Sequence, residues 1–168
     1  MDLSIKSATA EDKEIIFSLL QPYLKELSRY PNEQADYQDE KGIYCYPYLD
    51  AYWQEDGRYP YLLLSDRKIA GFALVRRDSQ HWEMAEFYVL PEMRRRGFAT
   101  SFAVHILLKH PGGWRIECNN ANAAGNALWS KLARYFSKNQ MITGKTIAGR
   151  NIIRFNVFKA KEETTPQE

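Results

Sequence analysis

Apolar and polar residues alternate along residues 3–8, and this period of two predicts a short β-strand. Thr9 and Asp12 follow with the spacing of a capping box, which predicts that a helix begins here. An apolar stripe at helical spacing then runs to about Tyr30. Pro22 lies inside this stripe without the backbone N–H that a helix needs, so we expect it to kink the helix or to restart it as a second one.

The segment of residues 31–60 is polar at first and then dense in aromatic residues, which are Tyr44, Tyr46, Tyr48, Tyr52 and Trp53. One interpretation is a loop that packs onto the core through its rings. The other is a wall of a substrate pocket, because long irregular segments in compact domains are often binding elements. The two interpretations stand about level, and both can hold together. We take Tyr48, Tyr52 and Trp53 as candidate substrate-binding residues.

Three strand patterns follow in quick succession with short turns between them, which predicts an antiparallel meander over residues 61–66, 69–77 and 81–90. The later part of the chain predicts a helix over residues 94–110, a strand over 114–119, a helix over 120–136 and a terminal hairpin over 139–144 and 150–158. The order βααβββαβαββ is that of an α+β fold. We expect one domain over residues 1–159 and a disordered polar tail over residues 160–168.

Composition and charge exclude several classes of protein. The formal net charge is +2 with both signs well mixed, whereas a nonspecific nucleic-acid binder usually carries a larger basic excess. Cys45 and Cys118 stand far apart without a metal-ligand pattern, so we expect neither a disulfide framework nor a metal site. No apolar run is long enough for a membrane span and the N-terminus lacks a secretory pattern, so we expect a cytoplasmic protein without membrane or nucleic-acid partners.

The stretch PEMRRRGFAT, residues 91–100, combines a basic run with the expected start of a helix. The first N–H groups of a helix have no backbone partner and carry the positive end of the helix dipole. Gly97 allows a ligand to approach the backbone closely, and Ala99 keeps the next turn low. These features suit a diphosphate. A solvated basic corner explains the spacing equally well, so both interpretations stay open at this point.

Arg94-x-x-Gly97-x-Ala99, after a strand that ends in VLP, resembles the R/Q-x-x-G-x-G/A motif of the GNAT superfamily of acyl-CoA-dependent N-acyltransferases. Residues 119–132, NNANAAGNALWSKL, resemble a second segment of that family, in which Asn122 matches the conserved asparagine position. The resemblance covers residues 3–158. It is closest to an uncharacterised bacterial branch with an aromatic-rich YLD-x-YW segment before the meander.

The resemblance implies a central mixed, mostly antiparallel sheet flanked by helices. It also implies transfer of an acetyl group from acetyl-CoA to an amine, here expected to be a small molecule, by direct attack in a ternary complex. The residues that it assigns to the coenzyme are Phe87, Tyr88, Val89, Arg94, Arg95, Arg96, Gly97, Phe98, Ala99, Thr100, Asn122 and Trp129.

Two departures from the family pattern lie in the second segment. Trp129 stands where the family often has a tyrosine that protonates the departing thiolate, and an indole N–H does not readily give up its proton. A non-catalytic acyl-CoA sensor on the same fold is therefore the alternative. Gly125 replaces the usual alanine. A homodimer is left open.

The candidate catalytic residues lie on the third strand of the meander. Glu83 and Glu86 are expected on opposite faces, because side chains alternate along a strand. Glu86 is the favoured base, since AEFYV is otherwise apolar and an acid there needs a reason. Tyr88 shares the face of Glu86 and is a candidate to bind or relay a proton.

Asn122 and Trp129 each have a structural and a functional interpretation. Asn122 either caps its helix or binds the pantetheine arm of the coenzyme. We favour the coenzyme, because Asn120 is available as the cap. Trp129 is either a core residue or a wall beside the thioester, and aromatic residues on helices are usually core.

Overall fold

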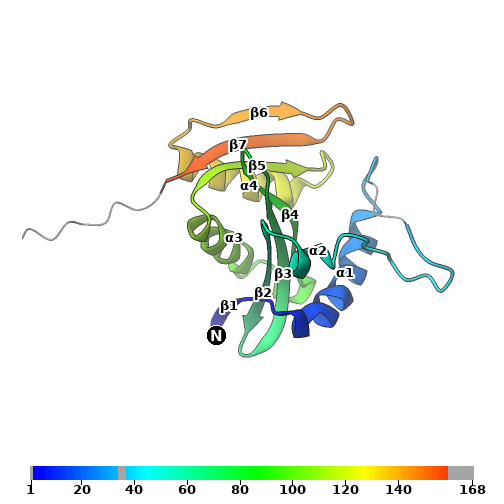
Figure 1. The fold of residues 1–168 in the computed structure, drawn as a ribbon. Helices are drawn as coiled ribbons and strands as arrows, with labels where there is room; N and C mark the ends of the chain where they lie inside the picture. Colours follow the sequence, from blue (N-terminus) through cyan, green and yellow to red (C-terminus); the bar gives the residue numbers. More distant parts are fainter. Residues whose placement is uncertain (1, 34–36, 159–168) are drawn as a thin grey trace, which may run out of the picture.

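A computed structural model describes residues 2–33 and 37–158 (Figure 1). The tail expected over residues 160–168 lies outside the described residues. Seven strands form one sheet in the order β1-β2-β3-β4-β5-β7-β6. The strands are β1 Leu3–Ser7, β2 Arg58–Ser65, β3 Lys68–Arg77, β4 Trp82–Val89, β5 Gly112–Cys118, β6 Ile142–Lys145 and β7 Asn151–Val157. Only β4 and β5 pair in parallel, so the expected mixed, mostly antiparallel sheet is confirmed.

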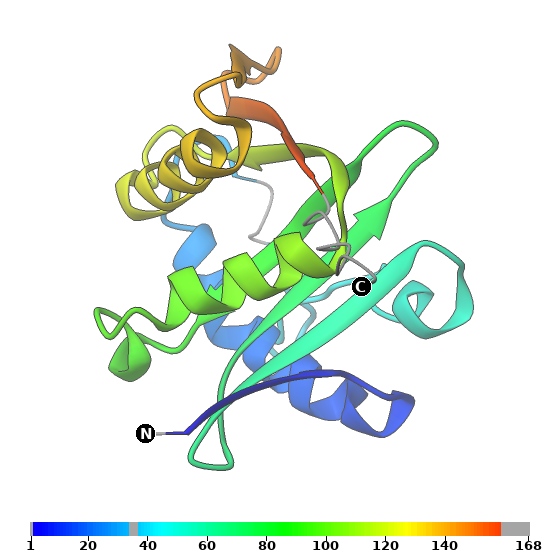
Figure 2. The same ribbon diagram turned by 90° about the vertical axis from the view of Figure 1, so that its left-hand side faces the viewer.

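Helices cover both faces of the sheet (Figures 1 and 2). They are α1 Lys13–Leu27, α2 Ala51–Gln54, α3 Phe98–Lys109 and α4 Ala123–Ser137, with 3₁₀ turns η1 Ala10–Asp12 and η2 Pro91–Met93. One apolar core lies between the sheet and α3 with α4, and a second lies between the sheet and α1 with α2. None of the described helices is both long and apolar enough to cross a membrane.

The turn η1, directly before α1, follows the sequence pattern, but the interior of α1 does not. The Asp12 carboxylate accepts a hydrogen bond of 2.9 Å from the Thr9 N–H, as the capping box predicts. Pro22 does not divide the helix, because α1 continues through it with buried Leu20 and Leu24 on either side. Packing of this apolar stripe outweighs the lost backbone hydrogen bond. The second helix of the predicted order is instead α2, inside the segment expected to be irregular.

A β-bulge at Ala85 decides which side chains of β4 share a face. Met84 pairs with Val75 on β3, and Glu86 pairs with Leu74, so Ala85 has no partner of its own across the ladder. The extra residue shifts the alternation by one. Glu83 and Glu86 therefore lie on the same face, toward α1 and α2, and the prediction of opposite faces was wrong. Tyr88 shares that face, as predicted.

The parallel strands β4 and β5 pair over a short distance only. Their register comprises Trp82 with Trp114 and Glu83 with Arg115. Beyond these pairs β4 continues to Val89 beside β3, while β5 continues to Cys118 beside β7. The two strands thus diverge within the sheet, and the edge of β4 that faces β5 is left without a strand partner from Glu86 onward.

The close approach of β3 to the end of β4 depends on Gly71. A Cβ atom built there would lie 2.2 Å from the Tyr88 carbonyl oxygen. We expect Gly71→Ala to lower the free energy of unfolding by about 3 kcal/mol, because backbone atoms must shift to admit the methyl group. Gly144→Ala is the matched control, since a Cβ atom there meets nothing within 4 Å. Urea unfolding measures both, and an equal effect of the two substitutions would contradict this packing.

Candidate active site

A cavity of about 490 Å³ opens where β4 and β5 diverge. Its walls come from α1, the segment that precedes α2, the strands β3, β4 and β5, the start of α4 and the turn before β7. The lining residues are Tyr23, Leu24, Leu27, Glu33, Tyr37, Cys45, Tyr46, Pro47, Tyr48, Arg76, Met84, Ala85, Glu86, Phe87, Glu117, Cys118, Asn119, Asn122, Trp129 and Arg150. This volume lies within the range of small-molecule sites.

Glu86 lies in the wall of this cavity between two tyrosines. The Tyr23 hydroxyl donates to one carboxylate oxygen at 2.5 Å, and the Tyr46 hydroxyl donates to the other at 3.0 Å. Burial raises the pKa of Glu86 to about 7, although both tyrosine hydrogen bonds favour the ionised form. A carboxylate with this pKa can accept and release a proton near neutral pH.

The segment that carries Tyr46 is fastened to α1 by Gln21. Its side-chain amide donates to the Tyr44 carbonyl at 3.0 Å, and its oxygen accepts from the Tyr44 N–H at 2.9 Å. This pair of hydrogen bonds holds the chain beside the cavity, where Tyr46 and Tyr48 join its lining. This part of the segment therefore forms a cavity wall, and its contact with a substrate stays a prediction.

The remaining aromatic candidates serve the core. Tyr52 is buried within the cluster under α1 and α2. The Trp53 indole donates to the Ala8 carbonyl at 3.1 Å and packs against the same cluster. Neither residue lines the cavity, whereas Tyr48 and Glu86 do. The loop-packing interpretation therefore holds for this second part.

Glu83 has a different environment from Glu86. Its carboxylate pairs with Arg76 Nε at 2.5 Å and with an Arg115 amino group at 2.9 Å. Burial alone would raise the pKa of Glu83, but the two arginines outweigh it and hold that pKa below its usual range. Glu83 is not among the residues that line the cavity. Its ion pairs leave it poorly suited to accept a proton.

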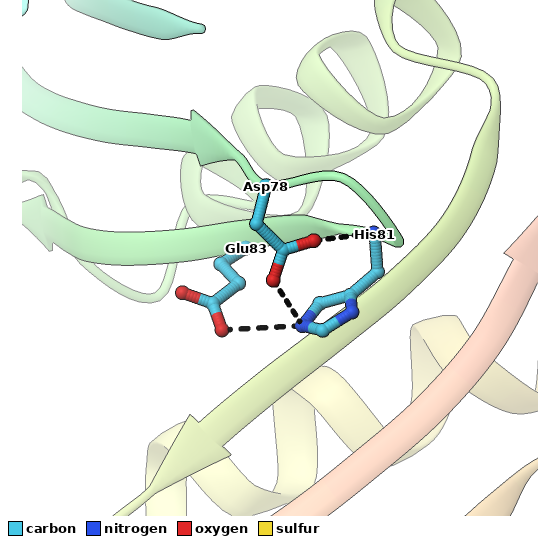
Figure 3. A group of neighbouring side chains, drawn as sticks. All are labelled: Asp78, His81 and Glu83. Carbon is cyan, nitrogen blue, oxygen red and sulfur yellow. Dashed lines mark hydrogen bonds and ion pairs between the residues drawn. The ribbon is translucent and has the colours of Figure 1, made fainter.

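Asp78, His81 and Glu83 gather at the turn between β3 and β4 (Figure 3), with one potential metal-ligand atom from each within 4.8 Å of the others. All three side chains already take part in hydrogen bonds or ion pairs. Asp78 accepts the N–H of Gln80 at 2.7 Å and of His81 at 2.8 Å, and the His81 ring lies 3.3 Å from Glu83. Since Glu83 is also paired with two arginines, a cation here would meet like charge. In this structure the cluster stabilises the turn between β3 and β4.

The basic loop ends in a left-handed turn before α3. Arg95 has a φ of 61° and Gly97 has a φ of 80°, and α3 begins at Phe98. The Ser101 N–H is bonded to the Gly97 carbonyl at 3.0 Å, as the first regular turn requires. The preceding N–H groups, of Phe98, Ala99 and Thr100, belong to the helix terminus that has no intrahelical acceptor. A Cβ atom on Gly97 would meet nothing within 4 Å, so the turn lies beside open space.

The three arginines of this loop are not equivalent. Arg94 donates from Nε to the Val89 carbonyl at 2.8 Å and pairs with Glu26 on α1 at 2.7 Å. Its guanidinium also lies over the Tyr88 ring, 5.4 Å from the centroid. Arg94 thus fastens the loop to β4 and α1. Arg95 and Arg96 are exposed beside the helix terminus.

The direction of the β4 backbone groups follows from one hydrogen bond. The Leu90 N–H bonds to the Ala70 carbonyl on β3 at 2.8 Å. Because N–H groups alternate along a strand, Tyr88 also points to β3, while Phe87 and Val89 point toward the gap beside β5. Two of the three predicted backbone positions can therefore donate into the gap.

Asn122 caps α4. Its Oδ1 atom accepts the Gly125 N–H at 2.9 Å, so the expectation that Asn120 is the cap was wrong. Asn122 nevertheless lines the cavity. Steric crowding explains why residue 125 is a glycine. A Cβ atom there would lie 2.8 Å from Asn122 Nδ2 and 2.9 Å from Cys118 Sγ.

Trp129 is both core and wall. It is 5% exposed and packs edge-on against the Phe87 ring with centroids 5.1 Å apart. It also lines the cavity, so it stands beside the strand at the point where β4 and β5 diverge. The core interpretation is confirmed, and the place beside a thioester stays a prediction.

Several lining residues escaped the sequence analysis. Tyr23 and Tyr46 are 63 and 40 residues from Glu86 in the chain, and Arg76 and Arg150 stand in ordinary strand and turn patterns. The only available signal was a hydroxyl-bearing Tyr23 on an apolar stripe and the density of tyrosines near Tyr46. Neither signal shows that these tyrosines contact Glu86, because a local pattern does not say which distant residues meet in the fold.

Comparison with known proteins places these features in a wider group. The model of the acetyltransferase (GNAT) family matches residues 24–133 of the chain. No curated protein sequence matches the chain significantly.

Solved structures resemble the chain over nearly its whole length. The PaiA N-acetyltransferase of Thermoplasma acidophilum in complex with coenzyme A has a TM-score of 0.67 and 15% identity, over 93% of this chain and 99% of that one. The ribosomal-protein-S18-alanine N-acetyltransferase of Escherichia coli has a TM-score of 0.63 and 17% identity, over 98% and 100%. A GNAT family acetyltransferase of Elizabethkingia anophelis with acetyl-CoA bound has a TM-score of 0.60 and 14% identity, over 92% and 98%. At these identities the likeness concerns the fold.

The raised pKa of Glu86 makes folding stability depend on pH. From its ordinary value of 4.5 to its folded value of about 7, the unfolded chain ionises Glu86 while the folded chain keeps it protonated. Wild type should therefore lose at most about 3 kcal/mol relative to Glu86→Gln as pH rises through this window. Below pH 4.5 the two proteins should keep a constant difference. Urea unfolding at fixed pH values measures it.

Glu83→Gln is the control with the opposite sign. Because its ion pairs lower the pKa of Glu83, wild type should be more stable than this variant at neutral pH and lose that advantage as pH falls below 4.5. A pH-independent difference between wild type and Glu86→Gln would contradict the assigned environment of Glu86.

Proposed function

This chain belongs to the acetyltransferase (GNAT) family, and we propose that it moves an acetyl group from acetyl-CoA to the amine of a small molecule. The observation that carries the proposal is the Glu86 carboxylate, held by two tyrosines with a pKa of about 7, in the cavity where β4 and β5 diverge. Acetyl-CoA and the acceptor bind together, and the amine attacks the thioester directly.

The proposed diphosphate site is the loop from Arg94 to Thr100. Its support is the start of α3 at Phe98, the left-handed turn at Gly97 beside open space, and the exposed Arg95 and Arg96. Neighbours of the same fold were solved with coenzyme A and with acetyl-CoA. The pantetheine arm then enters the gap between β4 and β5, beside Asn122 and Trp129.

Glu86 is the proposed general base. A primary amine with a pKa near 10 is mostly protonated at neutral pH, and its attack on a carbonyl carbon needs the free electron pair. Ionised Glu86 attracts the ammonium group and accepts its proton, directly or through one water molecule. Tyr23 and Tyr46 orient the carboxylate for this transfer. Tyr88 lies on the same face but outside the cavity lining, so we propose no proton relay through it.

Backbone N–H groups of Phe87 and Val89 are the proposed donors to the oxyanion of the tetrahedral intermediate. They point into the gap, where no strand competes for them. The leaving thiolate has a conjugate acid with a pKa of about 8.5, so it departs without an obligatory acid. Trp129 therefore serves as a wall, and its replacement of a tyrosine does not prevent turnover.

Cys118 supports direct attack over a covalent acyl-enzyme. It lies in the cavity wall, but burial raises the pKa of its thiol to about 11. A thiol with this pKa is a poor nucleophile at neutral pH. Its Sγ atom lies beside Gly125, where an added Cβ atom would be 2.9 Å away.

The first test of the base is Glu86→Gln. We expect kcat/KM to fall by about 10²- to 10⁴-fold while acetyl-CoA binding in calorimetry stays unchanged. In wild type, kcat should rise with pH around pH 7, and this limb should be absent from the variant. Tight acetyl-CoA binding without transfer to any amine would indicate the sensor alternative.

The diphosphate site can be tested by charge reversal. Arg95→Glu with Arg96→Glu should weaken acetyl-CoA binding at least about 10-fold, with a smaller effect at high salt, because two attractive charges become repulsive. Arg67→Glu with Lys68→Glu, at the exposed turn between β2 and β3, changes the net charge equally and should have little effect. Equal weakening by both pairs would place the coenzyme's diphosphate elsewhere.

A further inference from the structure

We infer that the acceptor is a free amino acid, with its amine at Glu86 and its carboxylate at Arg76. The inference rests on the proposed function and names the substrate class of the same site. It is carried by the position of Arg76, by the unequal pairing of its nitrogen atoms, and by the two glutamates that already pair with the other cavity arginine.

Arg76 and Glu86 are neighbours on one face of the sheet. Glu86 pairs with Leu74 on β3, and Arg76 lies two residues further along that strand. Diagonal neighbours of this kind are about 7 to 8 Å apart at the backbone, within reach of long side chains. Both side chains line the cavity. The cavity thus offers a carboxylate and a guanidinium side by side.

The guanidinium of Arg76 is only partly engaged. Its Nε atom bonds to Glu83 at 2.5 Å, which holds the side chain in place. Among the residues that the structure describes, its two terminal nitrogen atoms make no hydrogen bond, and Glu83 is the one ion-pair partner of the side chain. The side chain is 48% exposed. Its free end therefore suits a carboxylate, which an arginine fork binds with two parallel hydrogen bonds.

Arg150, the other arginine in the lining, is already paired with two glutamates. It contacts both carboxylate oxygens of Glu33 at 2.7 and 2.6 Å, and its Nε atom lies 3.4 Å from Glu117. A substrate carboxylate there would compete with two glutamates, whereas at Arg76 it would meet Glu83 alone. Arg76 is thus the better anchor for an anionic group.

The charges of Glu86 and Arg76 favour a zwitterion. A simple cationic amine near Glu86 would also meet the positive charge of Arg76, which costs free energy in a partly enclosed cavity. An α-amino acid carries the ammonium and the carboxylate on one carbon, so it satisfies both residues together. The N-terminus of a peptide lacks this carboxylate, because it has become an amide.

The experiment compares each amino acid with its carboxamide and with its decarboxylated amine, at saturating acetyl-CoA. Wild type should turn over at least one amino acid with a kcat/KM at least about 10-fold above that of both analogues. Arg76→Leu should lower kcat/KM for that amino acid by about 10- to 100-fold, mainly through KM, and change the carboxamide by no more than about 3-fold. Arg76→Lys should restore part of the loss.

Two controls separate binding from folding. Arg77→Leu removes the adjacent arginine, which lies over the Trp82 ring and not in the cavity, and should keep the preference for the amino acid. Acetyl-CoA binding by calorimetry should be the same in wild type and Arg76→Leu. An equal loss for the amino acid and its carboxamide would overturn the role of Arg76.

The outcomes also separate this inference from the proposed function. Efficient acetylation of carboxamides or simple amines, with no preference for amino acids, would overturn the substrate class and leave the acetyltransferase activity standing. Acetylation of peptide N-termini alone would overturn it in the same way. Absence of transfer to every amine would overturn both.

Discussion

The divergence of β4 from β5 is the constraint on which the rest of the site depends. A parallel pair that ends after Glu83 leaves the N–H groups of Phe87 and Val89 facing a gap. Unpaired backbone groups in an interior are costly, so the gap needs polar partners. Arg94 supplies one by donating to the Val89 carbonyl. The N–H groups of Phe87 and Val89 are the proposed donors to a thioester carbonyl, which links the defect in the sheet to the proposed chemistry.

The charged side chains around the cavity form a network of ion pairs that does not include Glu86. Ion pairs join Arg76, Glu83, Arg115, Glu117, Arg150 and Glu33 in sequence, with alternating sign. Of the glutamates in the described cavity lining, Glu33 and Glu117 belong to this network of ion pairs. Glu86 is bonded to tyrosine hydroxyls instead, and these donate hydrogen bonds without a positive charge. Burial can therefore raise its pKa, whereas the arginines prevent the same effect at Glu83.

The consecutive arginines of the basic loop have different environments. Arg94 is occupied by Glu26 and the Val89 carbonyl, so it joins α1, β4 and the start of α3 into one frame. Arg95 and Arg96 stay exposed at the helix terminus. The frame sets the distance between the proposed diphosphate site and the divergent strands. The loop is thus a structural clamp as well as the proposed anion site, where the sequence offered a choice between a basic corner and a ligand site.

The sequence by itself determined the features that depend on local periodicity and local turn geometry. It indicated the α+β order, the meander, the helix start near Gly97 and the family, and it made Glu86 a candidate base, because apolar period, capping residues and short motifs act over a few residues. Only the tertiary structure decided which residues meet. The bulge at Ala85 reversed the expected faces, and Gln21 brought Tyr46 to Glu86. Asn122 took the cap, and packing carried α1 through Pro22. Each of these outcomes depends on the relative free energies of contacts between segments that are distant in the sequence. A local sequence pattern does not contain that information.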